Sequence, residues 1–408
     1  MRLWQTNPFQ TVTITHGEGC KVWDTAGKSY LDLLSGTWCN VLGYGHPRWI
    51  KAVQEQVSKL THTGAPFITP EIDEALATLA EILSPKLNRA VFLNTGSEAV
   101  ELALKMARAA TGADGVVVTE RGYYGATSYA LALSETGRTA HYLPSPGTVY
   151  RLSAPDCQHC PMGCSWPCDD RFPCLDALAK LAEKGDKPIA AVIYEPVMAG
   201  AGNLVPPAGY GKRLRDLTSR CRALLIAEEV TTGMGRTGRW FGFEHDDIVP
   251  DILVIGKAIG AGLPISAVVT NDDVERRSRD TLGRHVQSHQ NDPFSGRIAA
   301  AVISILQEEH LVEQADEQGS YLLAGLKVLQ GSSSAISDVR GRGAMVGIEL
   351  HRDWSSKGAE ISQRLLDEGF IVNYHAPSNT FRLFPPFVIS DQEIDAFLEA
   401  FRVALHLK

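Results

Sequence analysis

The sequence predicts an α/β fold in which a large unit built on a mostly parallel sheet is joined by a smaller α+β unit. From about residue 70, short apolar segments alternate with helical patterns, as expected for strands that helices cover on both faces. Beyond residue 290 this order changes. The length of 408 residues also suits one large and one smaller domain better than one simple core.

The expected elements follow one another along the chain. Residues 20–33 predict two short strands around an Ala-Gly turn, and 71–83 predict a helix. NTGSEAVELALKMARAA predicts a helix that begins with capping residues. Buried strands are expected at 90–94, 115–120, 189–196, 223–229 and 251–257. Later in the chain we expect a long helix (297–309), a strand (343–350), a helix near 358–368, extended segments in FIVNYH and FRLFPP, and a last helix.

Composition excludes several classes of protein. The chain is 44% hydrophobic and 21% charged, which is ordinary for a globular protein. Its net charge of −8, without a long Lys/Arg run, argues against binding to nucleic acid or an anionic membrane. The amino terminus lacks a signal-peptide pattern, and no apolar segment approaches the length of a membrane span. We therefore expect a cytoplasmic protein.

Lys257 is the first candidate for a functional residue. The segment DILVIGKAIGAGLP places this lysine directly after an apolar strand, between Gly256 and Gly260. Open α/β sheets bind ligands at the carboxyl ends of their strands. A lysine also follows a strand by chance, so other segments must decide its role.

Four other segments suit one cofactor. NTGSEAVE puts Gly96 and Ser97 at a helix amino end, which favours a phosphate, although a simple capped helix has the same pattern. RGYYGAT offers Tyr123 for stacking on a flat ring. ALLIAEEV ends with two carboxylates, of which Glu228 can pair with a pyridinium nitrogen. FRLFPP supplies Arg382, which can bind a carboxylate through two parallel hydrogen bonds.

Over nearly its whole length the chain resembles the class III (ornithine/4-aminobutyrate-type) aminotransferases of the type I pyridoxal-phosphate fold. The resemblance implies a mostly parallel, seven-stranded sheet in a large cofactor-binding domain (46–287). Residues 1–45 and 288–408 would form the small domain. The landmarks occur in the family's order: VWDTAGKSYLDLLSG with GYGHP, NTGSEAVELALKMAR, GYYGAT, IYEPV, AEEVTTGMGRTG, PDILVIGKAIGAGLP, SHQNDP, VRGRGAMVGIEL and FRLFPP.

The resemblance assigns the cofactor roles. Lys257 would hold pyridoxal 5'-phosphate as a Schiff base, the internal aldimine, and then move protons. Gly96 and Ser97 would bind the phosphate. Tyr123 and Val230 would pack on opposite faces of the ring.

The remaining roles concern the substrate, a second subunit and the pyridine nitrogen of the cofactor. Ser288 takes the place of a threonine that reaches the neighbouring subunit's phosphate, which implies a homodimer. Glu195 would lie near the substrate and pair with Arg382, and Trp38 would shape the substrate pocket. Glu228 would partner the pyridine nitrogen.

The implied reaction moves an amino group between an amino acid or amine and a 2-oxo acid. Two alternatives use the same scaffold: an amino-acid racemase or epimerase, and a decarboxylation-dependent transaminase, since GAGLP and SHQNDP resemble dialkylglycine decarboxylase. A non-catalytic cofactor-binding protein is an alternative of another class. The GxGxxG match at 233–238 does not indicate a dinucleotide site, because it begins past the strand end and lacks a surrounding βαβ unit.

The chain departs from the family beside the cofactor. It has Glu228-Glu229-Val230-Thr231 where the family has Asp-Glu-Val-Gln, and SHQNDP where Thr-Phe-Gly-Gly-Asn-Pro is usual. A glutamate keeps the negative charge but is one methylene longer, and small displacements matter in catalysis. We therefore expect a substrate other than the family's best-known one.

Five of the eight cysteines lie between Cys157 and Cys174. Cys157, Cys160, Cys168 and Cys174 could supply a tetrahedral zinc site, or two of them a disulfide. We favour a loop of reduced thiols and expect no resident metal, because a full second CxxC is missing.

Overall fold

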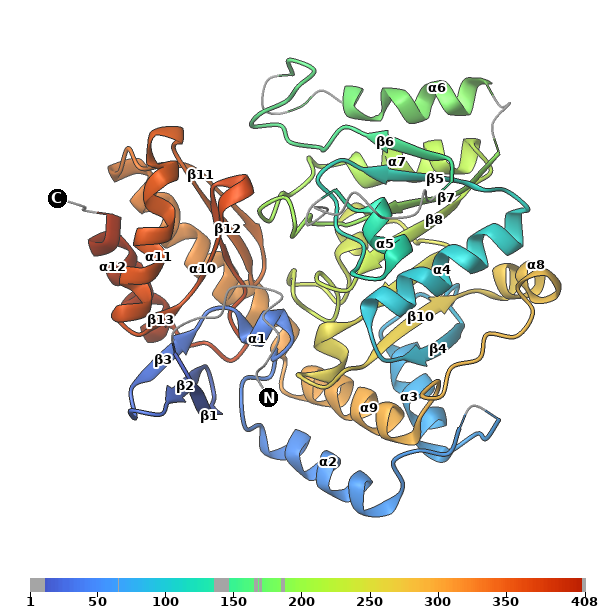
Figure 1. Ribbon diagram of the computed structural model, residues 1–408, viewed down its shortest axis with the longest axis horizontal. Helices are drawn as coiled ribbons and strands as arrows, with labels where there is room; N and C mark the ends of the chain where they lie inside the picture. The colour runs from blue at the N-terminus through green and yellow to red at the C-terminus, as the bar shows by residue number, and fades with distance from the viewer. Residues whose placement is uncertain are drawn as a thin grey trace, which may run out of the picture.

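The structure is a computed structural model that describes residues 12–64, 66–135, 147–164, 168, 171–184 and 188–405. In this part of the chain a large unit surrounds a seven-stranded sheet and a smaller unit lies beside it (Figure 1). The order in the large sheet is β4-β10-β9-β8-β7-β5-β6. Its strands are β4 (Arg89–Leu93), β5 (Gly115–Thr119), β6 (Val149–Leu152), β7 (Ile189–Tyr194), β8 (Leu224–Glu229), β9 (Ile252–Ile255) and β10 (Ser266–Thr270).

The large sheet is mostly parallel, which confirms the predicted fold class. β5, β6, β7, β8 and β9 are joined by parallel pairing, and β10 alone among the seven runs against its neighbours β4 and β9. Apolar side chains alternate between two core clusters, one on each face: in β8, Leu224 and Ile226 join one cluster, and Leu225 and Ala227 join the other. This is the two-residue period of a strand buried on both faces.

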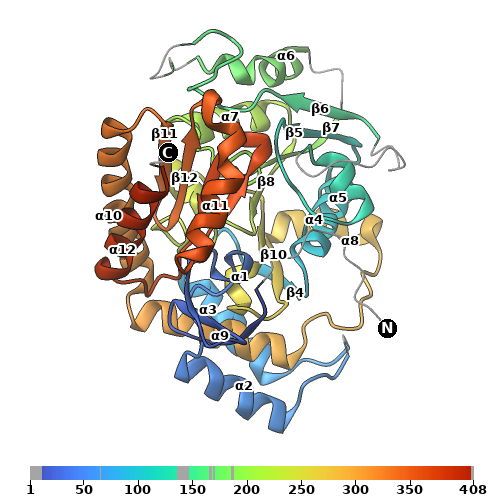
Figure 2. The ribbon, with the colours of Figure 1, turned by 60° about the vertical axis from the view of Figure 1, so that its left-hand side comes forward.

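Helices cover both faces of this sheet. α4 packs on β7, β9 and β10, with α8 outside it, and α9 runs beside α2 and α3 (Figure 2). Their bounds are α2 (Pro47–Lys59), α3 (Pro70–Glu81), α4 (Gly96–Thr111), α5 (Ser128–Leu133), α6 (Asp176–Lys184), α7 (Tyr210–Arg220), α8 (Asp272–Leu282) and α9 (Pro293–Glu308). α9 thus packs on the large unit although it follows residue 288, and the expected division at that residue stays a prediction.

The smaller unit combines both ends of the described chain. Its four-stranded sheet has the order β11-β12-β15-β14, and a second sheet, β1-β2-β3-β13, pairs β3 with β13 in parallel. α11 and α12 lie on the side of the first sheet that faces away from the large unit (Figure 1). The elements are β1 (Ile14–Glu18), β2 (Lys21–Asp24), β3 (Ser29–Asp32), the turn α1 (Ser35–Trp38), α10 (Leu311–Ser332), β11 (Ile336–Arg342), β12 (Met345–Leu350), α11 (Gly358–Asp367), β13 (Phe370–Ile371), β14 (Asn373–His375), β15 (Thr380–Leu383) and α12 (Asp391–Leu405).

Most expected elements occur within a few residues of their predicted positions. No range was predicted for several elements, among them β1, β6, β10, β11, α2, α7, α8 and the long helix α10. Among the described residues, no helix is long and apolar enough to cross a membrane.

Candidate active site

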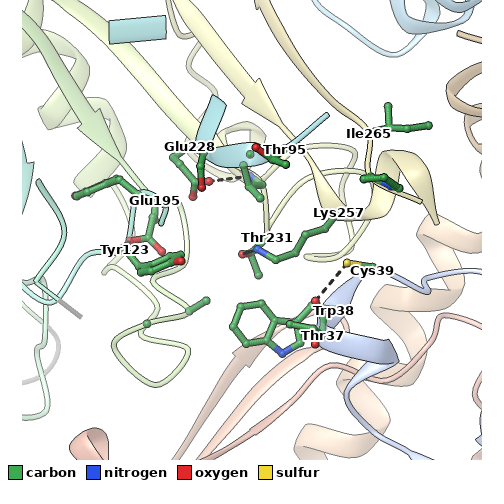
Figure 3. A pocket seen from close by; sticks show the side chains of 18 of the residues that line it. Thr37, Trp38, Cys39, Thr95, Tyr123, Glu195, Glu228, Thr231, Lys257 and Ile265 are labelled. Atoms are coloured by element: carbon green, nitrogen blue, oxygen red, sulfur yellow. Dashed lines mark hydrogen bonds between the residues drawn. The ribbon is translucent and has the colours of Figure 1, made fainter. Parts of the chain in front are cut away.

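Five strand ends of the large sheet open onto one cavity of about 500 Å³ (Figure 3). β4, β5, β7, β8 and β9 run in the same direction, so their carboxyl ends meet at one edge of the sheet. The side chains that reach the cavity from these ends are Thr95, Tyr123, Glu195, Glu228 and Lys257. Trp38 and Arg382 of the smaller unit line the opposite wall. The cavity therefore lies between the two units.

Lys257 projects into the middle of this cavity. It begins the short 3₁₀ turn Lys257–Gly260 directly after β9 and has a left-handed φ of 43°. Strained backbone of this kind in a non-glycine residue concentrates at functional sites. Its Nζ donates a hydrogen bond to Thr231 Oγ1 at 2.8 Å. Burial lowers the pKa of Lys257, with Glu228 acting in the opposite direction, so the neutral amine is more accessible than in water.

The two adjacent glutamates at the end of β8 point to opposite faces of the sheet. Glu228 continues the face of Leu224 and Ile226, lines the cavity, and accepts a hydrogen bond from Val230 N–H at 3.3 Å. Burial raises its pKa to about 7, while Lys257 lowers it. Glu229 instead accepts hydrogen bonds from three partners: the N–H groups of Gly242 and Phe243 and the hydroxyl of Thr232.

The amino end of α4 forms the third side of the cavity. Thr95 caps the helix: its Oγ1 accepts from Glu98 N–H at 3.2 Å, while the Glu98 carboxylate accepts from Thr95 N–H at 3.0 Å. This capping box leaves other N–H groups of the first turn available for an anion. A Cβ on Gly96 would come within 2.8 Å of Val230 Cγ1. Glycine is therefore required for this helix end to approach Val230.

Tyr123 and Ser97 complete the cofactor side of the site. Tyr123 is 38% exposed, lines the cavity, and its N–H donates to Glu195 Oε1 at 2.9 Å. Ser97 Oγ accepts from Ala126 N–H at 2.9 Å. A helix amino end, an aromatic ring, a buried carboxylate and a buried lysine around one cavity are the groups that suit a flat, phosphorylated, nitrogen-containing aromatic aldehyde.

Trp38 is held by an unusual turn. Ser35, Gly36, Thr37 and Trp38 have left-handed φ values of 48°, 54°, 66° and 73°, a conformation that costs about 1–2 kcal/mol per non-glycine residue. Asp32 compensates by accepting hydrogen bonds from the N–H groups of Leu34 and Gly36.

The turn places the indole beside both Lys257 and Arg382. The Trp38 ring centroid lies 4.9 Å from Lys257 Nζ and 5.1 Å from the Arg382 guanidinium. Trp38 also stacks on Phe384, with centroids 4.5 Å apart.

Arg382 and Glu195 lie in the same cavity but have separate partners. Arg382 Nε donates to Asn373 Oδ1 at 2.7 Å, and Nη1 donates to Ala199 O at 3.1 Å. Within the described residues no ion pair joins Arg382 to Glu195 in this structure. Burial, followed by the charge of Glu228, raises the pKa of Glu195 to about 8.

Some lining residues were not identified from the sequence as site residues. Cys39 follows the Trp38 turn, and His375 ends β14 with its Nδ1 2.7 Å from Ser378 Oγ. No local motif marks either residue, because tertiary packing brings them to the cavity. Thr231 was noticed as a departure from the family, and its hydrogen bond to Lys257 gives it a position in the site.

Three expectations concern residues outside the cavity. Ser288 lies on an exposed turn and does not line the cavity of its own chain. All eight cysteines are free thiols. None of Cys157, Cys160, Cys168 and Cys174 belongs to the group of metal-ligating side chains found among the described residues.

The fold and the groups around Lys257 define a pyridoxal-phosphate-dependent enzyme of fold type I. The family model described as aminotransferase class-III matches residues 4–405. The chain belongs to this family, whose members move an amino group between an amino acid and a 2-oxo acid.

Relatives and solved structures match along almost the whole chain. An acetylornithine aminotransferase of Methanopyrus kandleri is 35% identical over 394 residues, 97% of this chain and 94% of the relative. An ornithine aminotransferase of Staphylococcus aureus is 33% identical, over 96% of this chain and 94% of its own length. A thermostable (S)-enantioselective omega-transaminase of Thermomicrobium roseum has a TM-score of 0.90 and 28% identity, covering 98% of this chain and 96% of its own.

Proposed function

We propose that Lys257 is the catalytic lysine of this aminotransferase and that Arg382 binds the carboxylate of its amino-acid substrate. The observation that carries the proposal is the position of Lys257: a buried amine on a strained turn, in the cavity where five strand ends and the smaller unit meet. When bound, pyridoxal phosphate supplies an electron sink for the pair left by a broken bond at the substrate Cα.

Lys257 is suited to move the proton that leaves Cα. An amine acts as a general base only when it is neutral and within reach, and burial lowers the pKa of this amine. Lys257 Nζ donates a hydrogen bond to Thr231 Oγ1, and this contact orients the lone pair of the neutral amine. The indole of Trp38 packs beside the amine, with its ring centroid 4.9 Å from Nζ.

Glu228 is proposed as the partner of the pyridine nitrogen. It is the cavity-lining member of the glutamate pair at the end of β8, and it is 6% exposed. Burial disfavours the charged form of this carboxylate. A protonated pyridine nitrogen beside it would stabilise that charged form. Gly96, Ser97 and the first turn of α4 would hold the phosphate, with Tyr123 and Val230 beside the ring.

Arg382 supports an amino-acid donor rather than a simple amine. It is 9% exposed, and Asn373 and Ala199 fix the guanidinium plane. Asn373 Oδ1 accepts from both Nε and Nη2, so a carboxylate would bind at two points through the remaining N–H groups of Nη1 and Nη2. Ornithine and N-acetylornithine are the first donors to test, since an acetylornithine aminotransferase and an ornithine aminotransferase are 35% and 33% identical to this chain.

We further propose a homodimer in which Ser288 contributes to the neighbouring subunit's phosphate site. Its hydroxyl is exposed on a turn outside its own cavity. This position agrees with a role across a subunit interface.

The Lys257 assignment is tested with the Lys257→Ala variant. The purified wild-type enzyme should show a visible cofactor absorbance that borohydride abolishes irreversibly, and should form a 2-oxo acid from the donor. Lys257→Ala should retain the fold by circular dichroism but lose the borohydride reaction and at least about 10³-fold in turnover. If Lys257→Ala kept both the borohydride-sensitive absorbance and the wild-type turnover, the assignment would be wrong. Loss of optical rotation without any 2-oxo acid product would instead indicate racemisation.

A further inference from the structure

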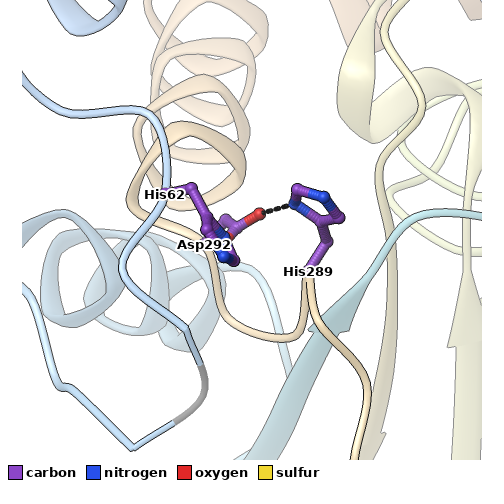
Figure 4. Close-up of side chains that lie close together, drawn as sticks. All are labelled: His62, His289 and Asp292. Atoms are coloured by element: carbon purple, nitrogen blue, oxygen red, sulfur yellow. Dashed lines mark hydrogen bonds and ion pairs between the residues drawn. The ribbon is translucent and has the colours of Figure 1, made fainter.

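Outside the active-site cavity, His62, His289 and Asp292 form a compact group (Figure 4). His62 lies in the segment after α2, His289 lies in the turn before α9, and Asp292 is the N-cap residue of α9. One ligand atom from each residue lies within 4.8 Å of the others. Two segments more than 200 residues apart in the sequence therefore meet at one carboxylate.

The carboxylate of Asp292 lies between the two imidazoles. Its Oδ1 is 2.6 Å from His62 Nδ1, and its Oδ2 is 2.6 Å from His289 Nδ1. The ring centroids are 4.6 Å apart. The Asp292 side chain is 7% exposed, whereas the histidines are 42% and 58% exposed. The group is thus anchored at the carboxylate and open on the imidazole side.

Asp292 does not use its side chain in the way its position favours. An aspartate at an N-cap ordinarily accepts a hydrogen bond from the backbone of the first helical turn, a contact worth about 1 kcal/mol. Asp292 begins a helix of 16 residues without any side-chain capping bond. Both of its oxygens are committed to the histidines instead, so the arrangement serves the three-residue group and not the helix.

We propose that His62, His289 and Asp292 bind a divalent transition metal ion of the zinc class. Two imidazole nitrogens and one carboxylate oxygen are ligands that Zn²⁺, Co²⁺ and Ni²⁺ accept, and three protein ligands leave a position for water or a small anion. Ligand atoms in a tetrahedral site lie roughly 3.3 Å apart. The 2.6 Å contacts need to widen by less than about 1 Å, which the exposed imidazoles allow.

The site borders the cavity of the enzyme without belonging to it. His62, His289 and Asp292 line a separate hollow of about 420 Å³. Asn94, Leu263, Pro264 and Ile265 line both that hollow and the active-site cavity. A bound ion would fix the segment after α2 to the turn before α9 on the far side of this shared wall. The metal site does not depend on the reaction proposed above.

The test is titration of the tag-free holoenzyme with Co²⁺ and Zn²⁺. We expect one ion per chain, and a Co²⁺ spectrum with ligand-field bands but without the intense near-ultraviolet band of thiolate ligands. His62→Ala, His289→Ala and Asp292→Asn should each weaken binding at least about 10-fold. His351→Ala removes an exposed histidine elsewhere and is the matched control. Zn²⁺ should raise the melting temperature of the wild type and of His351→Ala, but not of His289→Ala.

The titration can contradict the proposal in three ways. Unchanged Co²⁺ affinity in both His289→Ala and Asp292→Asn would overturn the proposal, as would absence of binding to the wild type. A thiolate band would assign the ion to the cysteines near residue 160 instead. Because His289 lies outside α9, in the turn before it, its replacement tests the site even if Asp292→Asn disturbs the helix.

Discussion

The two adjacent glutamates at the end of β8 have different roles although they are neighbours in the sequence. Both are buried, yet only Glu228 reaches the cavity, because successive strand residues point to opposite faces. Glu229 is committed to Gly242, Phe243 and Thr232 and stabilises the loop after the strand. Its neighbour has one backbone hydrogen bond and is free to serve a ligand.

Glu195 provides a pH test of the protein prepared without cofactor. Its folded pKa is raised to about 8, above the ordinary value of 4.5, so the folded apoenzyme binds this proton more tightly than the unfolded chain does. This contribution to stability is complete below about pH 4.5 and is lost as the pH rises through about 8. The apoenzyme should therefore lose stability over this window, and Glu195→Gln should lose less.

Urea unfolding of cofactor-free protein at several pH values between about 5 and 9 measures the effect. Glu313→Gln, at an exposed position in the first turn of α10, is the control and should behave as wild type. Parallel pH curves for wild type and Glu195→Gln would contradict the prediction.

Sequence patterns could predict most of the residues that the structure brings together around Lys257. Glu195, Glu228 and Lys257 end or directly follow apolar strands, and Gly96 and Ser97 begin a helix, so a local pattern marks these five residues. His375 and Cys39 could not be found in this way, because only tertiary packing carries them to the cavity. Among the sequence expectations, an ion pair between Glu195 and Arg382 is absent from the described contacts, since each side chain has backbone or amide partners nearer to it.

At the scale of elements, the beginning of α4 joins stability to ligand binding. Thr95→Ala removes the acceptor for Glu98 N–H and should destabilise the protein by about 1 kcal/mol. The first turn should fray, which disperses the N–H groups proposed to hold the phosphate. We therefore expect weaker cofactor binding, measured by titration of apoenzyme with pyridoxal phosphate.

Thr95→Ser keeps the hydroxyl and separates capping from other effects. It should retain both stability and cofactor affinity within a few tenths of a kcal/mol. Equal cofactor affinity in Thr95→Ala and wild type would show that the cap does not organise this helix end for the ligand.

The sequence did not predict β10, α10 or the turn at Ser35–Trp38, and each omission has a physical reason. β10 reverses direction within an otherwise parallel sheet, and its short apolar run gives no sign of orientation. α10 contains Gly319, which weakens a helical pattern. A Cβ there would clash with Gly343 O, so close packing and not helix propensity selects glycine. The left-handed turn at Ser35–Trp38 depends on hydrogen bonds to Asp32, which no short motif reveals.

At the scale of the whole molecule, the segment between β7 and α7 links the two units at the cavity. Asn203 is fully buried and its amide donates to Val346 O of β12 at 2.8 Å, while Ala199 O accepts from Arg382 of β15. Arg340 of β11 donates to Gly202 O. These contacts position the wall of the cavity that carries Arg382, and no local sequence pattern predicts them. Only the order of motifs along the chain indicated that these segments share a site.

The proposed homodimer leads to a prediction about mixed dimers. If Ser288 serves the neighbouring subunit, a dimer of one Lys257→Ala chain and one Ser288→Ala chain has one site with both defects and one site with neither. That intact site should bind cofactor as tightly as wild type and restore about half of the wild-type turnover per dimer, since each dimer has two sites. If Ser288 served its own chain, every site of the mixed dimer would carry one defect.

The measurement uses differently tagged chains, co-expressed and purified through both tags. The Ser288→Ala homodimer, which should need more cofactor for half-saturation, sets the lower reference, and the Lys257→Ala homodimer sets the inactive one. Turnover of the mixed dimer is then followed as a function of cofactor concentration. A half-saturation value equal to that of the Ser288→Ala homodimer would refute action across the interface, because the only site with an intact Lys257 would then still lack its hydroxyl. A wild-type value requires that the hydroxyl come from the other chain, since the chain that keeps Lys257 has none of its own at position 288.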